Sequence, residues 1–397
     1  MFKVLTLDRI AAEGLRRMPR SHYEVASEML NPDAVLLRSH DMHAMEVPES
    51  VLAVARAGAG TNNIPIDMFT QRGVPVFNTP GANANAVKEL VLGGLLLAAR
   101  NLCSSWEYVK GLDAEGKDLK KAVEAGKKTF VGYELPGRTL GVIGLGAIGV
   151  RVANAAHALG LKVLGYDPAL TVENAWKLEA DIEKVVSVGD LLARSDFVTL
   201  HVPLIDATRG MINADRLRLM RPKSVLLNFA RGEIVDEEAA LAALRDGHLD
   251  RYVTDFPSAA FRGDARVIAL PHLGASTYEA EANCAVMAAN ELRAFLEEGS
   301  IVNSVNFPPA AMPRAKGCRL TVSNANVPNM VGRISMTLGE HEHNIVDLLN
   351  KSRGDVAYTL VDVECSVAPN VVDALRAIEG VLAVRVVPPV GTVPTQT

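Results

Sequence analysis

The sequence predicts an α/β protein with two Rossmann-like parallel-sheet domains and a smaller C-terminal domain. Three observations support this fold class. Strand-like and helix-like segments alternate over roughly the first 300 residues, which is typical of parallel sheets. A glycine-rich turn lies between one such strand and the helix after it. The proline-rich stretch Phe307–Pro313 then precedes a segment of a different pattern, as expected of a linker between domains.

The strands fall into two series, each followed by helical sequence. The first series is Phe2–Leu7, Ala34–Leu37, Val51–Ala55 and Val74–Phe77; the second is Thr139–Ile143, Lys162–Tyr166, Phe197–His201, Ser224–Asn228, Tyr252–Thr254 and Arg266–Ala269. We therefore predict a discontinuous first domain over residues 1–92, completed by residues 277–307, with the second domain inserted as residues 93–276. Residues 308–317 are the predicted linker, and residues 318–388 the third domain.

The order of elements in the third domain is itself informative. Strands are predicted at Arg319–Val322, Ile345–Ser352 and Leu382–Val387, with a further strand that carries Val361, Val363 and Cys365 on one face; helices are predicted at Met330–Gly339 and near Val371–Ile378. This βαββαβ order predicts a ferredoxin-like domain.

Composition excludes several classes of protein. The 397 residues are 49% hydrophobic and 22% charged, an ordinary globular mixture, and the net charge of −5 gives no basic surface for nucleic acid. The most apolar stretch, Leu90–Ala99, is shorter than the ~20 residues that span a bilayer. The four cysteines are far apart and form no metal-binding pair. We expect a cytoplasmic protein without a metal or a membrane partner.

The glycine-rich turn predicts a dinucleotide site. Gly144, Gly146 and Gly149 fit G-x-G-x-x-G, and Ala147 and Ile148 complete the turn at the start of a helix. In such a motif the first glycine makes the tight turn, the second admits a pyrophosphate, and the third lets the helix pack closely.

The end of the next strand favours NAD over NADP. Asp167 lies eighteen residues beyond Gly149, where an acid accepts hydrogen bonds from the adenosine ribose and repels a 2′-phosphate. The alternative is that Asp167 only begins a turn with Pro168, which does not explain the spacing.

Two later motifs resemble the signature pair of the D-2-hydroxyacid dehydrogenases. They are Asn228-Phe-Ala-Arg-Gly232 and Pro271-His-Leu-Gly-Ala-Ser-Thr277, and the segments Arg56–Asn63, Phe77–Gly81 and Glu89–Gly93 match that family's substrate domain. The resemblance extends over nearly the whole chain. It implies that the two parallel-sheet domains bind substrate and NAD, and that Phe229, Ala230, Asp255 and Gly274 line the cofactor, with Asp255 near the nicotinamide carboxamide.

Arg231 and His272 are the candidate catalytic residues. Each follows a predicted strand and so lies at the carboxyl edge of the sheet, where open α/β folds bind ligands. A guanidinium can hold the substrate carboxylate, and an imidazole can accept the proton of a 2-hydroxyl group as hydride leaves. The other eight histidines are interpreted as structural or surface residues, including His157 and His201.

One position departs from the family pattern. Family members carry a glutamate that pairs with the histidine, whereas alanine stands at 259 and 260 here, and Asp264 is the nearest other candidate. We hypothesise that turnover is reduced unless Asp264 substitutes. Glutamate at 259 or 260 should then raise turnover, and an unchanged rate would place the partner elsewhere.

Arg38 and Arg56 are candidate substrate-binding residues, because both follow strands of the first domain. Arg56 leads into a loop with Gly58 whose backbone N–H groups are expected to be free to bind an anion. Resemblance to phosphoglycerate dehydrogenases makes the pair contacts for 3-phosphoglycerate. The alternatives are that both arginines are solvated, that the substrate is another acid such as hydroxypyruvate or glyoxylate, or that the chain is an NAD-sensing homologue with impaired turnover.

The C-terminal domain resembles an ACT domain, and those of phosphoglycerate dehydrogenases bind serine between paired subunits. Asn326 and Asn344 match serine-contacting positions, and Asn324 stands where a histidine is often found. The resemblance implies a serine effector and a homo-oligomer, a dimer or a tetramer. The alternative is that these asparagines only make turns.

Overall fold

The computed structural model describes residues 1–315 and 317–387, and the chain forms two compact units. Unit 1 is Met1–Ala82 together with the chain from Tyr278 onward, and unit 2 is Asn83–Thr277. The predicted boundary at 92/93 lies later than the observed one, because α3 (Ala84–Ala99) packs Val91 and Leu95 into the core of unit 2. Residue 316 of the predicted linker and residue 388 of the predicted third domain lie outside the described residues.

Unit 1 begins with a five-stranded parallel sheet in the order β2-β1-β3-β4-β5. Its strands are β1 (Phe2–Thr6), β2 (Tyr23–Ala26), β3 (Ala34–Leu37), β4 (Ala53–Arg56) and β5 (Val76–Phe77), with helices α1 (Ala12–Leu15), α2 (Ile66–Gln71) and α11 (Tyr278–Glu298). One core joins α11 to this sheet through Leu292 and Phe295, and a second core includes Phe69 of α2. Both faces of the strands are therefore buried, as the continuous apolar sequence of β3 predicts.

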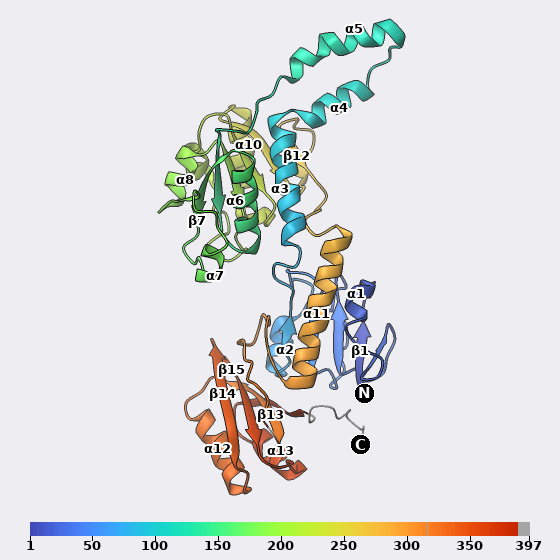
Figure 1. Ribbon diagram of the computed structural model, residues 1–397, viewed down its shortest axis with the longest axis vertical. Helices are drawn as coiled ribbons and strands as arrows, with labels where there is room; N and C mark the ends of the chain where they lie inside the picture. Colours follow the sequence, from blue (N-terminus) through green and yellow to red (C-terminus); the bar gives the residue numbers. More distant parts are fainter. Residues whose placement is uncertain (316, 388–397) are drawn as a thin grey trace. The chain divides into compact units, whose positions relative to one another are not determined.

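The end of unit 1 is an antiparallel sheet in the order β14-β15-β13-β16. It consists of β13 (Cys318–Ala325), α12 (Met330–Glu340), β14 (Ile345–Arg353), β15 (Val356–Val363), α13 (Pro369–Arg376) and β16 (Val381–Val387), which confirms the βαββαβ order. Both helices cover one face of this sheet, where Ile334 and Leu375 meet Leu320 and Val322 (Figure 1). Cys365 was predicted to lie on the third strand, but β15 ends at Val363.

The other face of this antiparallel sheet, which we call the tail sheet, packs on the five-stranded parallel sheet and on the end of α11. Three arginines supply donors to the last carbonyls of that helix: Arg385 to Phe295 and Leu296, Arg314 to Glu297, and Arg319 to Glu298. Arg319 is fully buried and forms a two-bond ion pair with Asp362, with N–O distances of 2.6 and 2.8 Å. These contacts satisfy carbonyls that a helix leaves unpaired and fix the tail domain to α11.

The proline-rich stretch is not a free linker. Phe307, Ala310 and Met312 are buried in the same core as α11, and Ile301 pairs with Ala310 in an isolated bridge. The sequence reading missed this because apolar residues between prolines carry no periodic pattern.

Unit 2 holds a seven-stranded parallel sheet in the order β12-β11-β10-β9-β6-β7-β8. The strands are β6 (Thr139–Ile143), β7 (Lys162–Tyr166), β8 (Glu183–Lys184), β9 (Phe197–Leu200), β10 (Ser224–Asn228), β11 (Leu249–Thr254) and β12 (Val267–Ala269). The order runs one way from β6 to β8 and the other way from β9 to β12. The point of reversal, between β6 and β9, is where doubly wound sheets bind ligands at their carboxyl edge.

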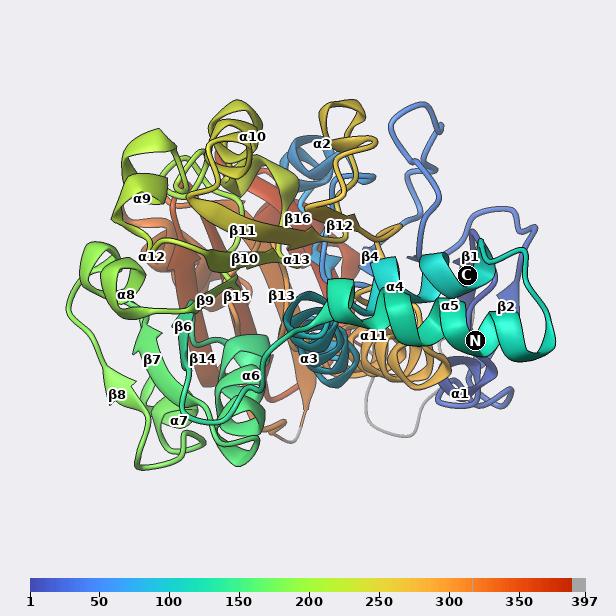
Figure 2. The same ribbon diagram turned by 90° about the horizontal axis from the view of Figure 1, so that it is seen from above.

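Helices cover both faces of this sheet (Figure 2). On one face lie α3 and α6 (Ala147–Ala158), and on the other α8 (Val188–Arg194), α9 (Ala214–Leu219) and α10 (Glu237–Arg245). The shorter elements are α7 (Val172–Ala175), η2 (Gly232–Ile234) and η3 (Ala259–Phe261). Asp236 caps α10, with its side chain accepting from the N–H of Ala239.

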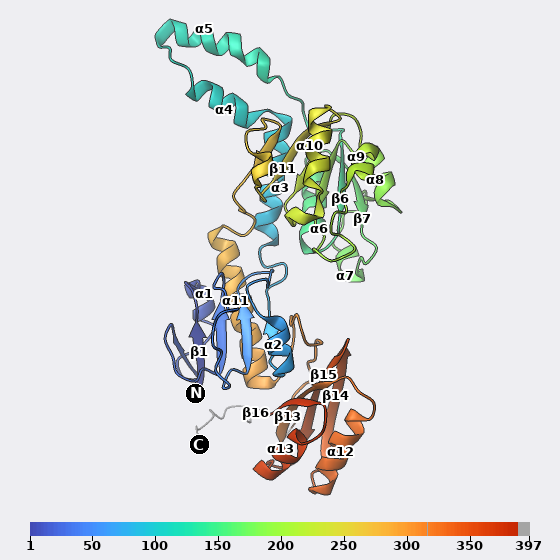
Figure 3. The same ribbon diagram turned by 180° about the vertical axis from the view of Figure 1, so that it is seen from behind.

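Three features were not predicted from the sequence. The edge strands β2 and β8 are short, and β8 is exposed. In unit 2, α4 (Leu102–Lys110), α5 (Gly116–Gly126) and η1 (Lys127–Phe130) form an arm that extends away from the sheet (Figures 1 and 3). Neither α4 nor α5 contains a buried residue.

Within the described residues, no helix is long and apolar enough to cross a membrane.

Candidate active site

The glycine-rich turn lies at the carboxyl end of β6. Gly144 has a φ of 92°, and a Cβ there would lie 2.5 Å from the carbonyl oxygen of His201, so this position requires glycine. A Cβ on Gly149 would overlap the carbonyl of Gly144, whereas the space around Gly146 is open. Ala147 and Ile148 form the first turn of α6, where backbone N–H groups have no partner within the helix. The turn therefore fits a pyrophosphate.

Asp167 ties the end of β7 to this turn. One carboxylate oxygen accepts from the N–H of Leu145 at 2.8 Å, and the other accepts from the N–H of Ala169 at 2.8 Å. The second bond belongs to the turn that the alternative interpretation expects. Asp167 therefore both begins this turn and contacts the glycine-rich turn. Because an ionised carboxylate offers about four acceptor positions, ribose hydroxyls can still be bound there.

Arg231 is positioned by the turn that follows β10. The side chain of Asn228 donates to the carbonyl of Arg231 at 2.8 Å and accepts from the N–H of Ala230 at 3.1 Å. Phe229 is buried between these contacts and anchors the segment in the core. The guanidinium donates to the carbonyl of Ala230 at 2.6 Å, and the residue is half-buried.

His272 is held by backbone contacts in an unusual conformation. Its φ is 48°, and its N–H donates to the carbonyls of Asp255 at 2.9 Å and Leu270 at 3.1 Å. The residue is exposed, and its imidazole lies 4.9 Å from the ring of Phe256 at an interplanar angle of 51°. A left-handed conformation in a non-glycine residue is uncommon and often marks a functional site.

Asp255 links these two candidates. Burial raises the pKa of its carboxyl group, while the charge of His272, the N–H of Gly274 and the charge of Arg231 act in the opposite direction. The side chain is 1% exposed, and one oxygen accepts from the N–H of Gly274 at 3.1 Å. The other oxygen is buried with no partner among the described residues. An amide donor of a bound cofactor fits that position, as the family resemblance implies for the nicotinamide carboxamide.

The hypothesis that Asp264 replaces the missing partner of His272 is wrong. Both of its oxygens contact Arg266 at 2.8–3.0 Å, and that pairing lowers the pKa of Asp264. Ala259 and Ala260 are exposed on η3. Asp255 is therefore the carboxylate whose interaction with His272 the structure records.

In unit 1, Arg38 and Arg56 lie at the ends of the neighbouring strands β3 and β4. The guanidinium of Arg56 donates to the carbonyls of Arg38 and Gly60, and that of Arg38 forms an ion pair with Glu281 at 2.8 Å. The expectation of a loop with free N–H groups was wrong for Gly58, whose N–H donates to the carbonyl of Arg56 at 2.8 Å. Glu281 was missed because nothing in the local sequence connects it with Arg38.

The three asparagines of the tail domain do not meet within one chain. Asn324 was expected in a loop but lies buried in β13, and its amide donates to the carbonyl of Ala325. Asn326 follows at the same end of the sheet and contacts Gly354, whereas Asn344 precedes β14 at the opposite end. A ligand site that used all three would need a second copy of the chain.

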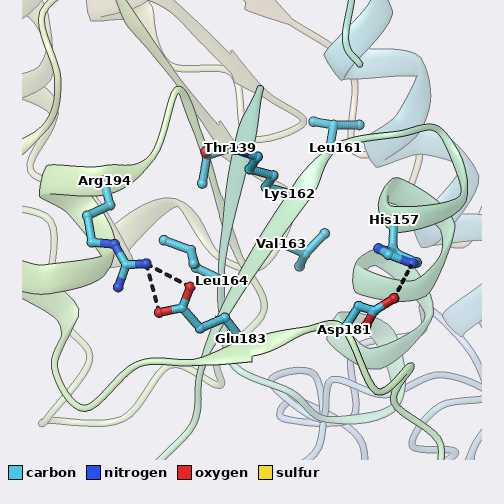
Figure 4. Close-up of a pocket in the computed structure, with 9 residues that line it drawn as sticks. All are labelled: Thr139, His157, Leu161, Lys162, Val163, Leu164, Asp181, Glu183 and Arg194. Atoms are coloured by element: carbon cyan, nitrogen blue, oxygen red, sulfur yellow. Dashed lines mark hydrogen bonds and ion pairs between the residues drawn. The ribbon is translucent and has the colours of Figure 1, made fainter. Parts of the chain in front are cut away.

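Two other histidines have structural surroundings. His201 is half-buried, the loss of solvent around its ring lowers its pKa to about 3, and the ring contacts Thr199. His157 lines a pocket of about 360 Å³ with Thr139 and Lys162, at the amino ends of β6 and β7 (Figure 4). In this pocket Glu183 pairs with Arg194 and His157 pairs with Asp181, so these groups are not available as catalytic groups. The pocket lies away from the dinucleotide turn, which is at the carboxyl end of β6.

A doubly wound unit with a dinucleotide turn, and with an arginine and a histidine that follow later strands of the same parallel sheet, defines a nicotinamide-dependent dehydrogenase. Comparisons with known proteins agree. Residues 93–274 match the family described as D-isomer specific 2-hydroxyacid dehydrogenase, NAD binding domain. A D-3-phosphoglycerate dehydrogenase from Haemophilus influenzae is 32% identical over 354 residues, covering 86% of this chain and 82% of the relative. The corresponding Escherichia coli protein is 33% identical and covers 85% and 82%.

Solved structures agree on the fold. An NAD⁺-bound 3-phosphoglycerate dehydrogenase from Entamoeba histolytica has a TM-score of 0.59 and 28% identity, covering 77% of this chain and 98% of that one. A D-mandelate dehydrogenase from Rhodotorula graminis, at 24% identity, has a TM-score of 0.65 and covers 78% and 99%. The chain belongs to the D-isomer specific 2-hydroxyacid dehydrogenases and is an NAD-dependent dehydrogenase.

Proposed function

We propose that this enzyme oxidises 3-phospho-D-glycerate to 3-phosphohydroxypyruvate with NAD, the first step of phosphorylated L-serine biosynthesis. The observation that carries the proposal is that Arg231 and His272 follow β10 and β12, at the carboxyl edge of the sheet whose strand β6 leads into the dinucleotide turn. The phosphorylated substrate is supported by the cationic pair Arg38 and Arg56 and by relatives that are themselves named D-3-phosphoglycerate dehydrogenase.

In this mechanism the chain orients the substrate and moves one proton. Arg231 holds the substrate carboxylate and its neighbouring oxygen, so that the C2–H bond is presented to the cofactor. His272 accepts the proton of the 2-hydroxyl group as the C–O bond becomes a carbonyl. When bound, NAD accepts the hydride from C2.

The choice of NAD over NADP rests on Asp167. Its carboxylate lies at the end of β7, held by the N–H groups of Leu145 and Ala169. A 2′-phosphate on the adenosine ribose would be repelled by this charge.

Regulation by serine belongs to the same proposal. A site that includes Asn326 and Asn344 would be shared between two copies, since the two residues lie at opposite ends of the tail sheet. We therefore propose a homo-oligomer, a dimer or a tetramer, that binds serine between tail domains. Four widely spaced cysteines fit a cytoplasmic location.

A second candidate is the same chemistry on a 2-hydroxy acid without phosphate. The ion pair between Arg38 and Glu281 favours it, because it offsets the charge that would attract a phosphate group.

The test is NADH formation from 3-phospho-D-glycerate in the presence of a carbonyl trap, compared with D-glycerate and D-lactate. We expect the phosphorylated substrate to give the highest kcat/KM, and NAD to be preferred over NADP. His272→Gln should lower kcat about 100-fold or more, whereas His157→Gln should not. A higher kcat/KM for D-glycerate would support the second candidate. An activity that His272→Gln leaves unchanged would contradict the mechanism.

A further inference from the structure

The guanidinium of Arg38 is paired with a carboxylate at the start of α11. Its Nη1 atom lies 2.8 Å from Oε1 of Glu281, and the two side chains are 32% and 39% exposed. The guanidinium of Arg56, on the neighbouring strand, donates to the carbonyls of Arg38 and Gly60.

These groups form one cluster within unit 1. Cys284 lies one turn after Glu281 on α11, and its thiol is influenced by the charges of Arg38, Arg56 and Glu281. Burial raises the pKa of that thiol, so it adds no negative charge near neutral pH. Glu281 is the acidic side chain that contacts the guanidinium of Arg38.

The backbone next to Arg38 is also occupied. Asp8 accepts from the N–H groups of Arg38, Ser39 and His40 at 2.8–2.9 Å. An anion that approaches the end of β3 finds these donors already bound to a carboxylate. It depends on the guanidinium groups for attraction.

We propose that Glu281 is a specificity-determining residue, whose carboxylate weakens the binding of a dianionic group at Arg38 while affecting singly charged substrates much less. This inference rests on the proposed function, in which the cationic pair Arg38 and Arg56 supports a phosphorylated substrate. A phosphate monoester carries about −1.5 to −2 charges near pH 7, so it is repelled by Glu281 and competes with it for Arg38. A hydroxyl group at the same position, as in D-glycerate, is neither repelled by Glu281 nor in competition with it for Arg38.

The test is Glu281→Gln, assayed with NAD at saturation. Glutamine has nearly the same shape, and its carbonyl oxygen can still accept from Arg38, so the substitution removes the charge but not the contact. We expect KM for 3-phospho-D-glycerate to fall roughly threefold to tenfold with kcat unchanged, because an exposed pair has a modest energy. KM for D-glycerate should change less than about twofold, and the Ki of inorganic phosphate should fall with the KM for the phosphorylated substrate.

Two further variants test whether Glu281 acts through Arg38 or only through the negative charge that it places near the helix N-terminus. Glu279→Gln removes an exposed acid from the same first turn of α11, and so reproduces the loss of charge near the helix N-terminus. It should leave every KM unchanged. In an Arg38→Gln background, Glu281→Gln should have no further effect on phosphate binding if it acts through Arg38.

The inference is overturned if Glu281→Gln leaves the Ki of inorganic phosphate unchanged or raises it. An equal effect of Glu279→Gln, or an effect that persists without Arg38, would overturn it as well. Failure of the wild-type enzyme to oxidise 3-phospho-D-glycerate would instead refute the proposed function. Inhibition by phosphate, measured with whichever 2-hydroxy acid is oxidised, would then still test Glu281.

Discussion

At the scale of single residues, the site depends on one buried carboxylate. His272 is exposed and held by its backbone, and Arg231 is half-buried, so neither is fixed by side-chain packing alone. Asp255 is buried, bound to the N–H of Gly274, and interacts electrostatically with both. It can therefore orient two charged groups while its second oxygen remains available to the cofactor.

This role predicts a difference between two aspartates. Asp255→Asn keeps an acceptor for Gly274 but removes the charge of the buried carboxylate whose second oxygen remains available to the cofactor, so we expect kcat to fall about tenfold to 100-fold with the fold intact. Asp264→Asn should leave kcat within about twofold and lower only the Tm, because Asp264 pairs with Arg266. NADH formation and thermal unfolding measure both. Equal losses of kcat in the two variants would contradict the assignment.

At the scale of elements, α11 connects the parts of unit 1. Its first turn carries Glu281, which pairs with Arg38, and its last carbonyls are bound by arginines of the tail domain. Between them, Glu291 is 4% exposed, with one oxygen accepting from Asn303 at 2.6 Å and the other without a partner in the described part of the chain. Burial raises the pKa of Glu291 to about 8.

The raised pKa of Glu291 predicts a stability that depends on pH. In the unfolded chain this group ionises near its ordinary pKa of 4.5, whereas in the folded chain it keeps its proton to about pH 8. The free energy of unfolding should therefore decrease between these values, by roughly 5 kcal/mol in total, and level off above pH 8. Glu291→Gln should abolish this decrease and raise the Tm at pH 9, while changing it little at pH 4. Parallel pH profiles of Tm for variant and wild type would refute the prediction.

The sequence predicts helices and strands best where their buried residues form a recognisable apolar pattern. Strands buried on both faces, such as Ala34–Leu37 and Ser224–Asn228, were predicted with their observed bounds because continuous apolar residues mark them. The short exposed strand Glu183–Lys184 and the α4–α5 arm have no buried apolar face, so periodicity could not reveal them.

The site shows the same limit. Arg231 and His272 could be placed at one sheet edge because residues after parallel strands share it. The pairing of Asp264 with Arg266, and of Glu281 with Arg38, depends on which loops and helices meet in three dimensions. The Asp264–Arg266 pair overturned the hypothesis that Asp264 is the partner of His272, and the Glu281–Arg38 pair was not predicted.

At the scale of the whole molecule, the arm of unit 2 leaves an apolar surface uncovered in one chain. Tyr108 of α4 packs against the returning segment, with its hydroxyl donating to Ala122 and its ring 5.3 Å from Phe130. The opposite side of α4 exposes Leu102, Trp106 and Val109, which are 44%, 64% and 52% exposed and follow helical spacing; we name these three residues the arm face. A contiguous apolar face on a projecting helix is typical of an association surface.

We predict that copies of this chain associate through the arm face. Trp106→Asp places a charge at its centre, and burying an unpaired charge is costly, so the variant should sediment as a smaller species than the wild type. Trp176→Asp is the matched control: the same substitution in unit 2, at a tryptophan that is 85% exposed on α7, should leave the mass unchanged. NAD binding by both variants would show that unit 2 remains folded. If Trp106→Asp keeps the wild-type mass, or if both variants dissociate alike, the arm face is not the interface, and the shared serine site would have to rest on the tail domains alone.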